Sequence, residues 1–152
     1  MTLREAMALA LEEARLAAEA GDVPVGAVVL KGEQCIAKAH NQREALADPT
    51  AHAEMLALRE AARLLGTRRL TGCTLVVTLE PCPMCAGALV MSGLTRCVWG
   101  ARDERQGCCE SVYALPMDPA FYHRCECAGG LMENECAALL KDFFENRRGK
   151  GE

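Results

Sequence analysis

Three residues near the middle of the chain are of the types that bind zinc. His52 is the first residue of the sequence His-Ala-Glu, and Cys82 and Cys85 are the first and last residues of the sequence Cys-Pro-Met-Cys. An imidazole and two thiols are donors that zinc prefers, and three protein ligands leave a fourth tetrahedral position for water or hydroxide. Zinc lowers the pKa of such a water toward neutrality. The motifs therefore predict a catalytic Zn²⁺ site held by His52, Cys82 and Cys85.

Glu54 adds the proton chemistry that such a site needs. It follows His52 by two residues, so its carboxylate can reach the water without binding the metal. A carboxylate in this place can take a proton from the water and return it later in the reaction. Taken alone, Glu54 would be explained as an ordinary acidic residue in the first turn of a helix. Beside the three ligands, it is the predicted catalytic residue.

Two other uses of the cysteines stay open. A structural zinc site closes with four protein ligands, and His40 or His123 could supply the last one. Such a binding or scaffold protein would leave Glu54 without a role, so we favour the catalytic site. A second metal site near His123 would draw on Cys108-Cys109 and Cys125-Cys127. Neither pair has the two-residue gap of a zinc knuckle, and buried cysteine packs as a small hydrophobe.

The apolar periodicity predicts the elements that position these motifs. Thr2 and Glu5 form a capping-box pattern, and Thr50 after Pro49 can cap a second helix. Pro83 suits the first turn of a third helix. The order of the elements indicates a mixed sheet with helices on both faces. We expect helices over 3–20, 50–66, 83–92 and 133–146, a short helix over 110–114, and strands over 25–30, 34–39, 73–79, 96–101 and 125–128.

Length and composition limit the function. The 152 residues are 51% hydrophobic and 25% charged, which is typical of one soluble globular domain over 1–152. Apolar stretches of about ten residues are too short for a membrane helix, and the N-terminus lacks an export signal, so we expect no membrane association and a cytoplasmic location. In that reducing compartment, ten cysteines indicate metal binding or packing.

The charge of the chain bears on its partners. A net charge of −4 gives no overall attraction to nucleic acid, so any such binding must be local. Arg68-Arg69 and Arg147-Arg148-Lys150 could supply a basic rim for RNA, although a solvated surface is the commoner explanation of such runs.

Longer stretches around the motifs extend the pattern over nearly the whole chain. They read V-P-V-G-A-V at 23–28, N at 41, D-P-T-A-H-A-E at 48–54, T-L-E-P-C-P-M-C-A-G-A at 78–88, G-A-R-D at 100–103, E-C-A-A-L-L at 135–140 and D-F-F at 142–144. H-x-E with P-C-x-x-C is the signature of zinc nucleobase deaminases. Together these stretches resemble the bacterial tRNA adenosine deaminases, a zinc-dependent family of the cytidine deaminase-like superfamily.

The resemblance implies a fold, an activity and an assembly. The fold is a three-layer α/β/α domain around a central mixed five-stranded sheet. The activity is hydrolysis of adenosine to inosine at the first anticodon, or wobble, position of tRNA. The assembly is a homodimer with one Zn²⁺ in each subunit, held by the three ligands above, with Glu54 as the proton shuttle.

The resemblance also implies roles in binding the substrate. Asn41 would hold the flipped base, because a side-chain amide can donate to one ring atom and accept from another. The backbone at Ala53 and Pro81 would line the same pocket, and Asp103 would lie near the nucleotide backbone. Without a role in binding, Asn41 would be an ordinary asparagine in a turn and Asp103 a loop aspartate that caps a turn.

Two segments depart from the family's pattern. Its usual Ala-Ala-Gly-Ser reads Cys108-Cys109-Glu110-Ser111 here, and its Asn-His-Arg reads Tyr122-His123-Arg124. A carboxylate at 110, near where RNA phosphates would pass, is electrostatically unfavourable. The alternative substrate is therefore a free nucleobase or nucleoside, such as guanine, cytosine or a related heterocycle, deaminated by the same zinc and Glu54.

Overall fold

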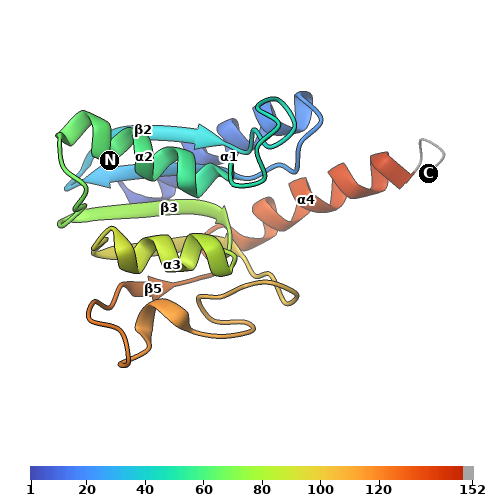
Figure 1. The fold of residues 1–152 in the computed structure, drawn as a ribbon. Helices are drawn as coiled ribbons and strands as arrows, with labels where there is room; N and C mark the ends of the chain where they lie inside the picture. Colours follow the sequence, from blue (N-terminus) through green and yellow to red (C-terminus); the bar gives the residue numbers. More distant parts are fainter. Residues whose placement is uncertain (149–152) are drawn as a thin grey trace.

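The computed structural model describes residues 1–148, in which a five-stranded sheet is packed between helices (Figure 1). The strands are arranged in the order β2-β1-β3-β4-β5. β1 is antiparallel to β2 and to β3, whereas β3, β4 and β5 are parallel. The elements are α1 (Leu3–Glu19), β1 (Gly26–Lys31), β2 (Gln34–His40), α2 (Ala53–Leu65), β3 (Cys73–Leu79), α3 (Pro83–Met91), β4 (Arg96–Ala101), the 3₁₀-helix η1 (Leu115–Met117), β5 (Glu126–Ala128) and α4 (Glu133–Arg148).

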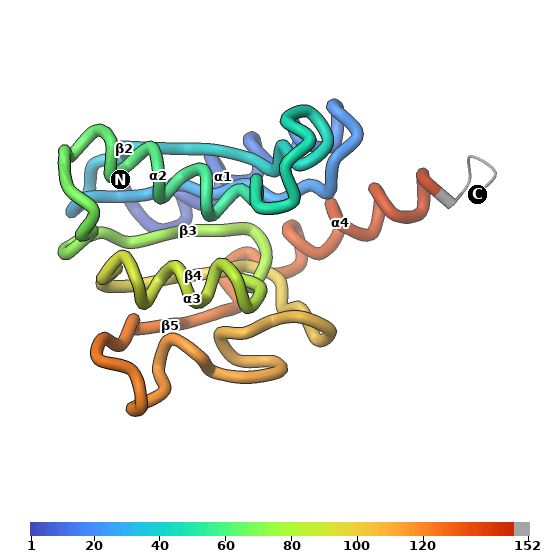
Figure 2. Tube along the Cα trace, in the orientation of Figure 1, coloured from blue at the N-terminus to red at the C-terminus, as the bar shows by residue number. Residues whose placement is uncertain are grey.

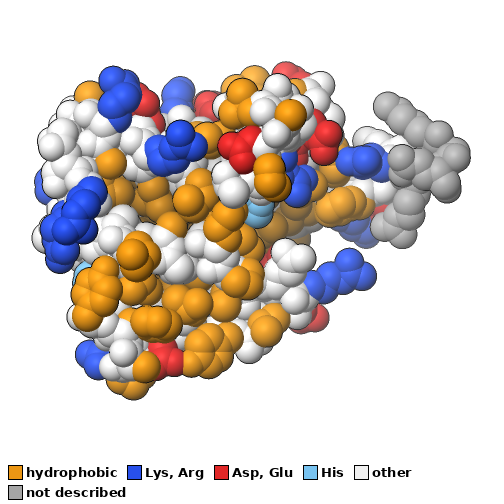
Figure 3. Space-filling model, in the orientation of Figure 1, with side chains coloured by type: hydrophobic (Ala, Val, Ile, Leu, Met, Phe, Trp, Pro, Cys, Tyr) orange, Lys and Arg blue, Asp and Glu red, His pale blue; other side chains and the backbone are white. Residues whose placement is uncertain are grey.

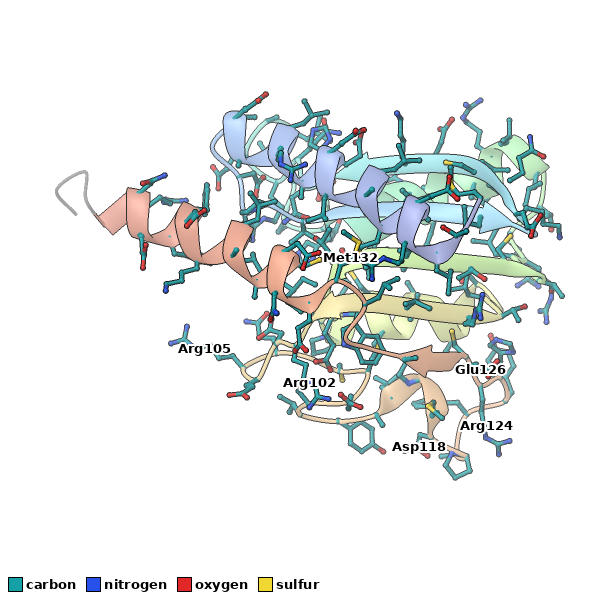
Figure 4. All side chains as sticks on the ribbon, turned by 180° about the vertical axis from the view of Figure 1, so that it is seen from behind. Arg102, Arg105, Asp118, Arg124, Glu126 and Met132 are labelled. Atoms are coloured by element: carbon teal, nitrogen blue, oxygen red, sulfur yellow. The ribbon has the colours of Figure 1, made fainter. Side chains whose placement is uncertain are left out.

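Helices cover both faces of the sheet, which confirms the three-layer α/β/α fold and the mixed five-stranded sheet. α2 and α3 lie on one face and α1 and α4 on the other (Figure 1 and Figure 4). Neighbouring residues of β1 alternate between the two apolar cores: Val29 packs on the side of α2 and α3, and Val28 on the side of α1 and α4. In the described part of the chain, no helix combines the length and the apolar character that a membrane crossing needs.

The second helix begins later than predicted. α2 begins at Ala53, and its N-cap residue is His52 rather than Thr50. The Thr50 hydroxyl donates to Asp48 Oδ1 at 2.7 Å, and the Thr50 N–H donates to the same oxygen at 2.8 Å. This local turn uses the hydroxyl that would have capped the helix. The correction places His52 itself at the helix start.

The short helix predicted over 110–114 is wrong, because the segment forms turns and η1 follows it. Val112 donates its N–H to the carbonyl of Gly107 at 2.8 Å, one residue further back than in an α-helix. The N–H groups of Glu110 and Ser111 donate to the Glu80 carboxylate at 2.8 Å each. The segment therefore curls around a distant carboxylate in a wider turn.

Both helices that carry the predicted ligands begin at the same end of the sheet. α2 and α3 start beside the carboxyl end of β3 (Figure 2). Only Glu80, Pro81 and Cys82 separate β3 from α3. In open α/β sheets, ligand sites gather at the carboxyl ends of the parallel strands. The fold therefore brings both motifs to one place.

The close approach of α1 to β1 leaves no space for a side chain at Gly26. A Cβ there would collide with the backbone oxygen of Ala10, whereas a Cβ at Gly87 in α3 would meet nothing within 4 Å. We predict that Gly26→Ala lowers the free energy of unfolding by about 3 kcal/mol. Gly87→Ala is the matched control, and it raises that free energy by about 0.5–1 kcal/mol because alanine favours the helix. Urea denaturation measures both, and wild-type stability of Gly26→Ala would contradict this packing.

Candidate active site

His52, Cys82 and Cys85 lie together where α2 and α3 begin. His52 Nδ1 is 3.7 Å from Cys82 Sγ and 3.7 Å from Cys85 Sγ. The three ligand atoms all lie within 4.8 Å of one another. Zn–N and Zn–S bonds of a tetrahedral site place such atoms about 3.6 Å apart. Both the donor chemistry and the spacing therefore fit zinc.

Two of these residues are N-cap residues that do not cap their own helices. The carbonyls of His52 and Cys82 accept the first helical hydrogen bonds, from Leu56 at 3.0 Å and Ala86 at 2.8 Å. Neither side chain makes a capping hydrogen bond, so both are free to bind another group. The unpaired N–H groups and the dipole at a helix start favour a thiolate. The helix starts thus both present the ligands and stabilise their charge.

The two cysteines share one negative charge. A hydrogen bond from the Cys85 thiol is the main reason that the pKa of Cys82 is lowered to about 4, and a hydrogen bond from His52 adds to it. The pKa of Cys85 is raised, because Cys85 donates in this pair and is buried. The same contact with Cys82 raises the pKa of His52. A metal cation bound by the three groups takes the place of the shared protons.

Glu54 lies in the first turn of α2 with its side chain directed to the same place. It is 4% exposed and lines one cavity together with His52 and Cys82. Burial raises the pKa of its carboxyl to about 7. A group with a pKa near neutrality can both accept and release a proton at physiological pH. Its position and proton affinity suit a proton shuttle.

The other histidines and cysteines lie apart from this group. Within residues 1–148, His52, Cys82 and Cys85 form the only cluster of three metal-binding side chains. His40 Nδ1 is 2.9 Å from Glu13 Oε1, and His123 Nε2 is 2.7 Å from the carbonyl oxygen of Leu94. In the described part of the chain, neither histidine therefore adds a fourth ligand, and the remaining cysteines build no second metal cluster.

A cavity of about 560 Å³ opens beside the three ligands. Its size suits a small heterocycle. Sequence reasoning assigned no role to eleven of its sixteen lining residues, among them Arg43, Glu80, Leu140 and Phe144. The lining residues come from separate parts of the chain: Val23, Val25, Asn41, Arg43, His52, Glu54, Leu79, Glu80, Cys82, Arg102, Asp103, Glu104, Arg105, Gln106, Leu140 and Phe144.

Asn41 lines the cavity and also joins two elements. Its Oδ1 accepts the N–H of Ala53 at 2.8 Å, and its Nδ2 donates to the carbonyl of Val23 at 3.1 Å. Because Ala53 is the first residue of α2, Asn41 supplies the cap that His52 does not. Ala53 itself is fully buried and does not line the cavity. One Nδ2 hydrogen and one Oδ1 lone pair of Asn41 are left for a ligand.

Asp103 is on the cavity wall, whereas Pro81 lies behind it. Asp103 Oδ1 accepts the N–H groups of Arg105 and Gln106 at 3.1 Å each, which is the turn-capping role of a loop aspartate. The Pro81 carbonyl accepts the N–H of Cys108 at 2.8 Å. Of the four residues expected to bind substrate, the structure therefore brings Asn41 and Asp103 to the cavity and leaves Ala53 and Pro81 outside its lining.

A buried carboxylate fixes Arg43 at the cavity. Arg43 Nε and Nη2 donate to Asp22 Oδ1 at 3.0 and 2.9 Å, and the N–H of Glu44 donates to Asp22 Oδ2 at 3.1 Å. Asp22 is only 2% exposed. Arg43 and Glu44 are 21 and 22 positions away from Asp22 in the sequence, so no local pattern could have identified the Asp22–Arg43 pair.

The unusual carboxylate at position 110 has a basic partner. Glu110 Oε1 lies 3.4 Å from Arg102 Nε, and both side chains are exposed. Such a pair contributes little to stability in water. It does offset the negative charge that Glu110 would otherwise place beside a polyanionic substrate.

The fold, the three ligands and the buried glutamate define a hydrolytic deaminase of the zinc-dependent class. The chain belongs to the family described as the cytidine and deoxycytidylate deaminase zinc-binding region, which matches residues 1–101.

Relatives of known activity cover almost all of the chain. The tRNA-specific adenosine deaminase of Bacillus subtilis (strain 168) is 48% identical over 141 residues, which are 93% of this chain and 88% of that protein. A solved structure from a study of A-to-I editing by tRNA:A34 deaminases at the wobble position of transfer RNA has a TM-score of 0.86 at 42% identity, covering 90% of this chain and 99% of that one. The guanine deaminase from Nitrosomonas europaea has a TM-score of 0.78 at 28% identity, covering 92% and 83%.

Asp22 gives the fold a dependence on pH. Burial alone would raise its pKa, but the N–H of Glu44 and the guanidinium of Arg43 outweigh burial and hold the pKa below its usual value. A lowered pKa means that the carboxylate stabilises the fold at neutral pH and that this contribution is lost as the pH falls through the folded-state value. We predict that Asp22→Asn costs about 2 kcal/mol at pH 7.

The difference between Asp22→Asn and the wild type should begin to shrink below about pH 4, where the carboxylate of the unfolded chain takes up a proton, and should disappear below the lowered pKa of the folded state. Chemical denaturation at several pH values measures it. Glu60→Gln, at an exposed carboxylate of α2, is the control and should show almost no loss at any pH. A deficit of Asp22→Asn that stays constant down to low pH would contradict the assignment.

Proposed function

We propose that this chain is a zinc-dependent tRNA adenosine deaminase that forms inosine at the wobble position of the anticodon. One observation carries the proposal: the His52, Cys82 and Cys85 ligand atoms lie within 4.8 Å of one another, and buried Glu54 lines the same cavity. The 48% identity to a tRNA-specific adenosine deaminase over nearly the whole chain supports the choice of substrate.

In this proposal, each group near the cavity has one task. His52, Cys82 and Cys85 would hold the zinc ion, which would supply a Lewis acid that lowers the pKa of water toward neutrality. Glu54 takes a proton from the attacking water and passes it to a ring nitrogen of adenine while the water oxygen bonds to C6. Glu54 then takes the remaining proton from the new C6 hydroxyl and delivers it to the amino group, the C6–N bond breaks, and ammonia and inosine remain.

The groups around the cavity support a base that is attached to RNA. Asn41 has one donor and one acceptor left for the edge of the flipped base. Arg102 and Arg105 extend from the segment after β4, on the side to which α4 projects (Figure 4). Guanidinium groups at such a position suit phosphates of the flanking nucleotides. Phe144, 43% exposed on the cavity lining, offers a surface on which a base can stack.

The basic rim expected from the sequence has a smaller part in this proposal. Arg68 and Arg69 are exposed at the end of α2, away from the cavity lining. Arg147 lies over the ring of Phe143, 5.4 Å from its centroid. Lys150 lies outside the described residues. Local charge for RNA is therefore assigned mainly to Arg105, because Asp22 and Glu110 offset the charges of Arg43 and Arg102.

A free nucleobase is the second candidate substrate. The likeness to a guanine deaminase favours it, since that fold and this one superpose closely. The same ligands and Glu54 would deaminate guanine. In that case the arginines at the cavity mouth would have no phosphates to bind.

We also propose that the chain forms a homodimer with one zinc in each subunit. Hydrophobic side chains gather over α3 and the segment that follows β4 (Figure 3). Met91 at the end of α3 is 67% exposed and Tyr122 is 69% exposed, and the Tyr122 hydroxyl reaches the Val90 carbonyl at 3.5 Å, so the two form one surface. Val112, Tyr113 and Met117, in the segment between β4 and β5, are exposed as well. Contiguous apolar surface of this kind marks an interaction site.

The proposal has two further parts. The chain acts as a single deaminase domain over residues 1–152, and it works in the cytoplasm. Cytoplasmic reducing conditions keep thiol ligands available for zinc, and a tRNA substrate is found there.

The replacement Glu54→Ala tests the mechanism. We predict that it lowers inosine formation in tRNA about 10²- to 10⁴-fold, because the proton shuttle is lost, while zinc content stays that of the wild type. Sequencing of tRNA incubated with either protein detects the inosine. Glu60→Ala, on the exposed part of the same helix, is the control that keeps full activity. Unchanged activity of Glu54→Ala would overturn the mechanism.

The choice of substrate has its own test. Wild-type protein with zinc should form inosine in a tRNA that carries adenosine at the first anticodon position, and should release no ammonia from free guanine, cytosine or adenine. Turnover of a free base that added RNA does not affect would instead establish the second candidate.

The dimer is tested by a charge on the apolar surface. We predict that Met91→Glu converts a dimer into a monomer in sedimentation experiments, because a buried unpaired carboxylate is costly at an interface. Leu16→Glu, at a residue 45% exposed on α1 and so on the opposite face of the sheet, should leave the dimer intact. A wild type that sediments as a monomer would contradict the proposal.

A further inference from the structure

Glu80 is a buried carboxyl group for which the mechanism above has no use. It lies between β3 and the ligand Cys82 and is 1% exposed. Within the described residues it forms no salt bridge with any Lys, Arg or His. A buried charge without a counter-ion is costly unless hydrogen bonds satisfy it. The hydrogen-bond donors around Glu80 therefore indicate its structural role.

All side-chain hydrogen bonds of Glu80 go to one stretch of the chain. Oε2 accepts the N–H groups of Cys109 at 3.2 Å, Glu110 at 2.8 Å and Ser111 at 2.8 Å. Oε1 accepts the N–H of Asp103 at 3.2 Å and the Ser111 hydroxyl at 2.5 Å. Three successive N–H groups converging on one oxygen form an anion-binding nest. We call residues 103–111 the wall segment, and the carboxylate binds it at both ends.

The wall segment also packs closely against Glu80. A Cβ at Gly107 would collide with the Glu80 carboxyl group and with the Asp103 carbonyl. Gly107 donates its N–H to that carbonyl at 2.7 Å, and Cys108 donates to the Pro81 carbonyl at 2.8 Å. The wall segment can therefore approach the carboxylate this closely only because residue 107 has no side chain.

The part of the wall segment between these two anchors faces the cavity. Asp103, Glu104, Arg105 and Gln106 all line it. Apart from the contacts with Glu80, the conformation of these four residues is held by a turn in which Asp103 Oδ1 accepts the N–H groups of Arg105 and Gln106. That turn and the hydrogen bond from Gly107 to the Asp103 carbonyl fix the residues relative to one another, whereas Glu80 and the hydrogen bond from Cys108 to the Pro81 carbonyl tie them to the segment that carries Cys82.

We propose that Glu80 is a positioning residue for the substrate: its carboxylate holds the wall segment in place beside the metal ligands and so sets how tightly the RNA around the target adenosine binds. The inference rests on the proposed function, since it names the class of contact that the wall segment makes. Glu80 does not touch the reacting atoms, and the proton transfers of Glu54 do not depend on it.

Glu80→Gln tests the proposal without changing the shape of the side chain. The side chain of glutamine has one acceptor oxygen, and the three N–H groups that bind Oε2 would occupy it. The amide NH₂ would then face the N–H of Asp103, and two donors form no hydrogen bond with each other. The wall segment is released at Asp103. We expect KM for tRNA to rise about 10- to 100-fold, with kcat within about threefold of the wild type and zinc content unchanged.

Gly107→Ala is an independent route to the same displacement, because it moves the wall segment and keeps the carboxylate. It should raise KM in the same way. Met7→Ala, in the core under α1, is the control for lost stability and should leave KM unchanged at a temperature where all the proteins are folded. If Glu80→Gln does not fold, Gly107→Ala decides: a raised KM supports the proposal, and a wild-type KM overturns it.

The remaining outcomes of these measurements also support or overturn the positioning role of Glu80. A loss of kcat at constant KM, or a loss of zinc, in Glu80→Gln would overturn the proposal, because Glu80 would then act on the chemistry or on the ligands. If the wild type forms no inosine, the proposed function fails, and hydrogen exchange still tests Glu80. Faster exchange of the amides at 103 and 109–111 in Glu80→Gln supports the positioning role, and unchanged protection overturns it.

Discussion

The hydrogen bond from the N–H of Ala53 to Asn41 Oδ1, at 2.8 Å, allows His52 to stand at the start of α2 without capping it. An N-cap side chain normally folds back onto its own helix. Here a residue from the end of the β1–β2 hairpin does so instead, and the imidazole is free to face the sulfur atoms of Cys82 and Cys85. The metal site therefore depends on a cap supplied from outside the helix.

Two buried carboxylates around the cavity likewise bind groups from other parts of the chain. Asp22 holds Arg43 and the N–H of Glu44, and Glu80 holds the wall segment. Apart from the Val23 N–H that binds Asp22, the groups that satisfy each carboxylate are more than twenty positions away in the sequence. Both join a loop that faces the substrate to a residue next to a rigid element. Held in this way, the cavity walls are arranged before any substrate arrives, which saves the cost of ordering them on binding.

The sequence predicts the parts of this site that have local signals. The spacing of Cys82 and Cys85, the Pro83 helix start and the apolar runs of the strands are short-range patterns, and the ligand grouping and the mixed sheet with helices on both faces follow from them. The three-layer fold itself is an implication of the family resemblance. What the sequence does not show is how polar groups pair over distance. Glu80 takes the N–H groups of 110 and 111 where a helix was predicted. The start of α2 differs for a local reason instead, because Asp48, two positions away, takes the Thr50 hydroxyl. Propensities describe a segment alone, so a distant partner can overrule them.

X-ray absorption at the zinc edge of the zinc-loaded protein tests the central claim most directly, namely that three side chains hold the metal and one position stays open. The account predicts two sulfur atoms at about 2.3 Å and two nitrogen or oxygen atoms at about 2.0–2.1 Å. One of the lighter atoms comes from His52, and the other should be replaced when a small anion such as cyanide is added. Three or four sulfur atoms, or a lighter ligand that no added anion displaces, would mean a closed structural site and would contradict the account.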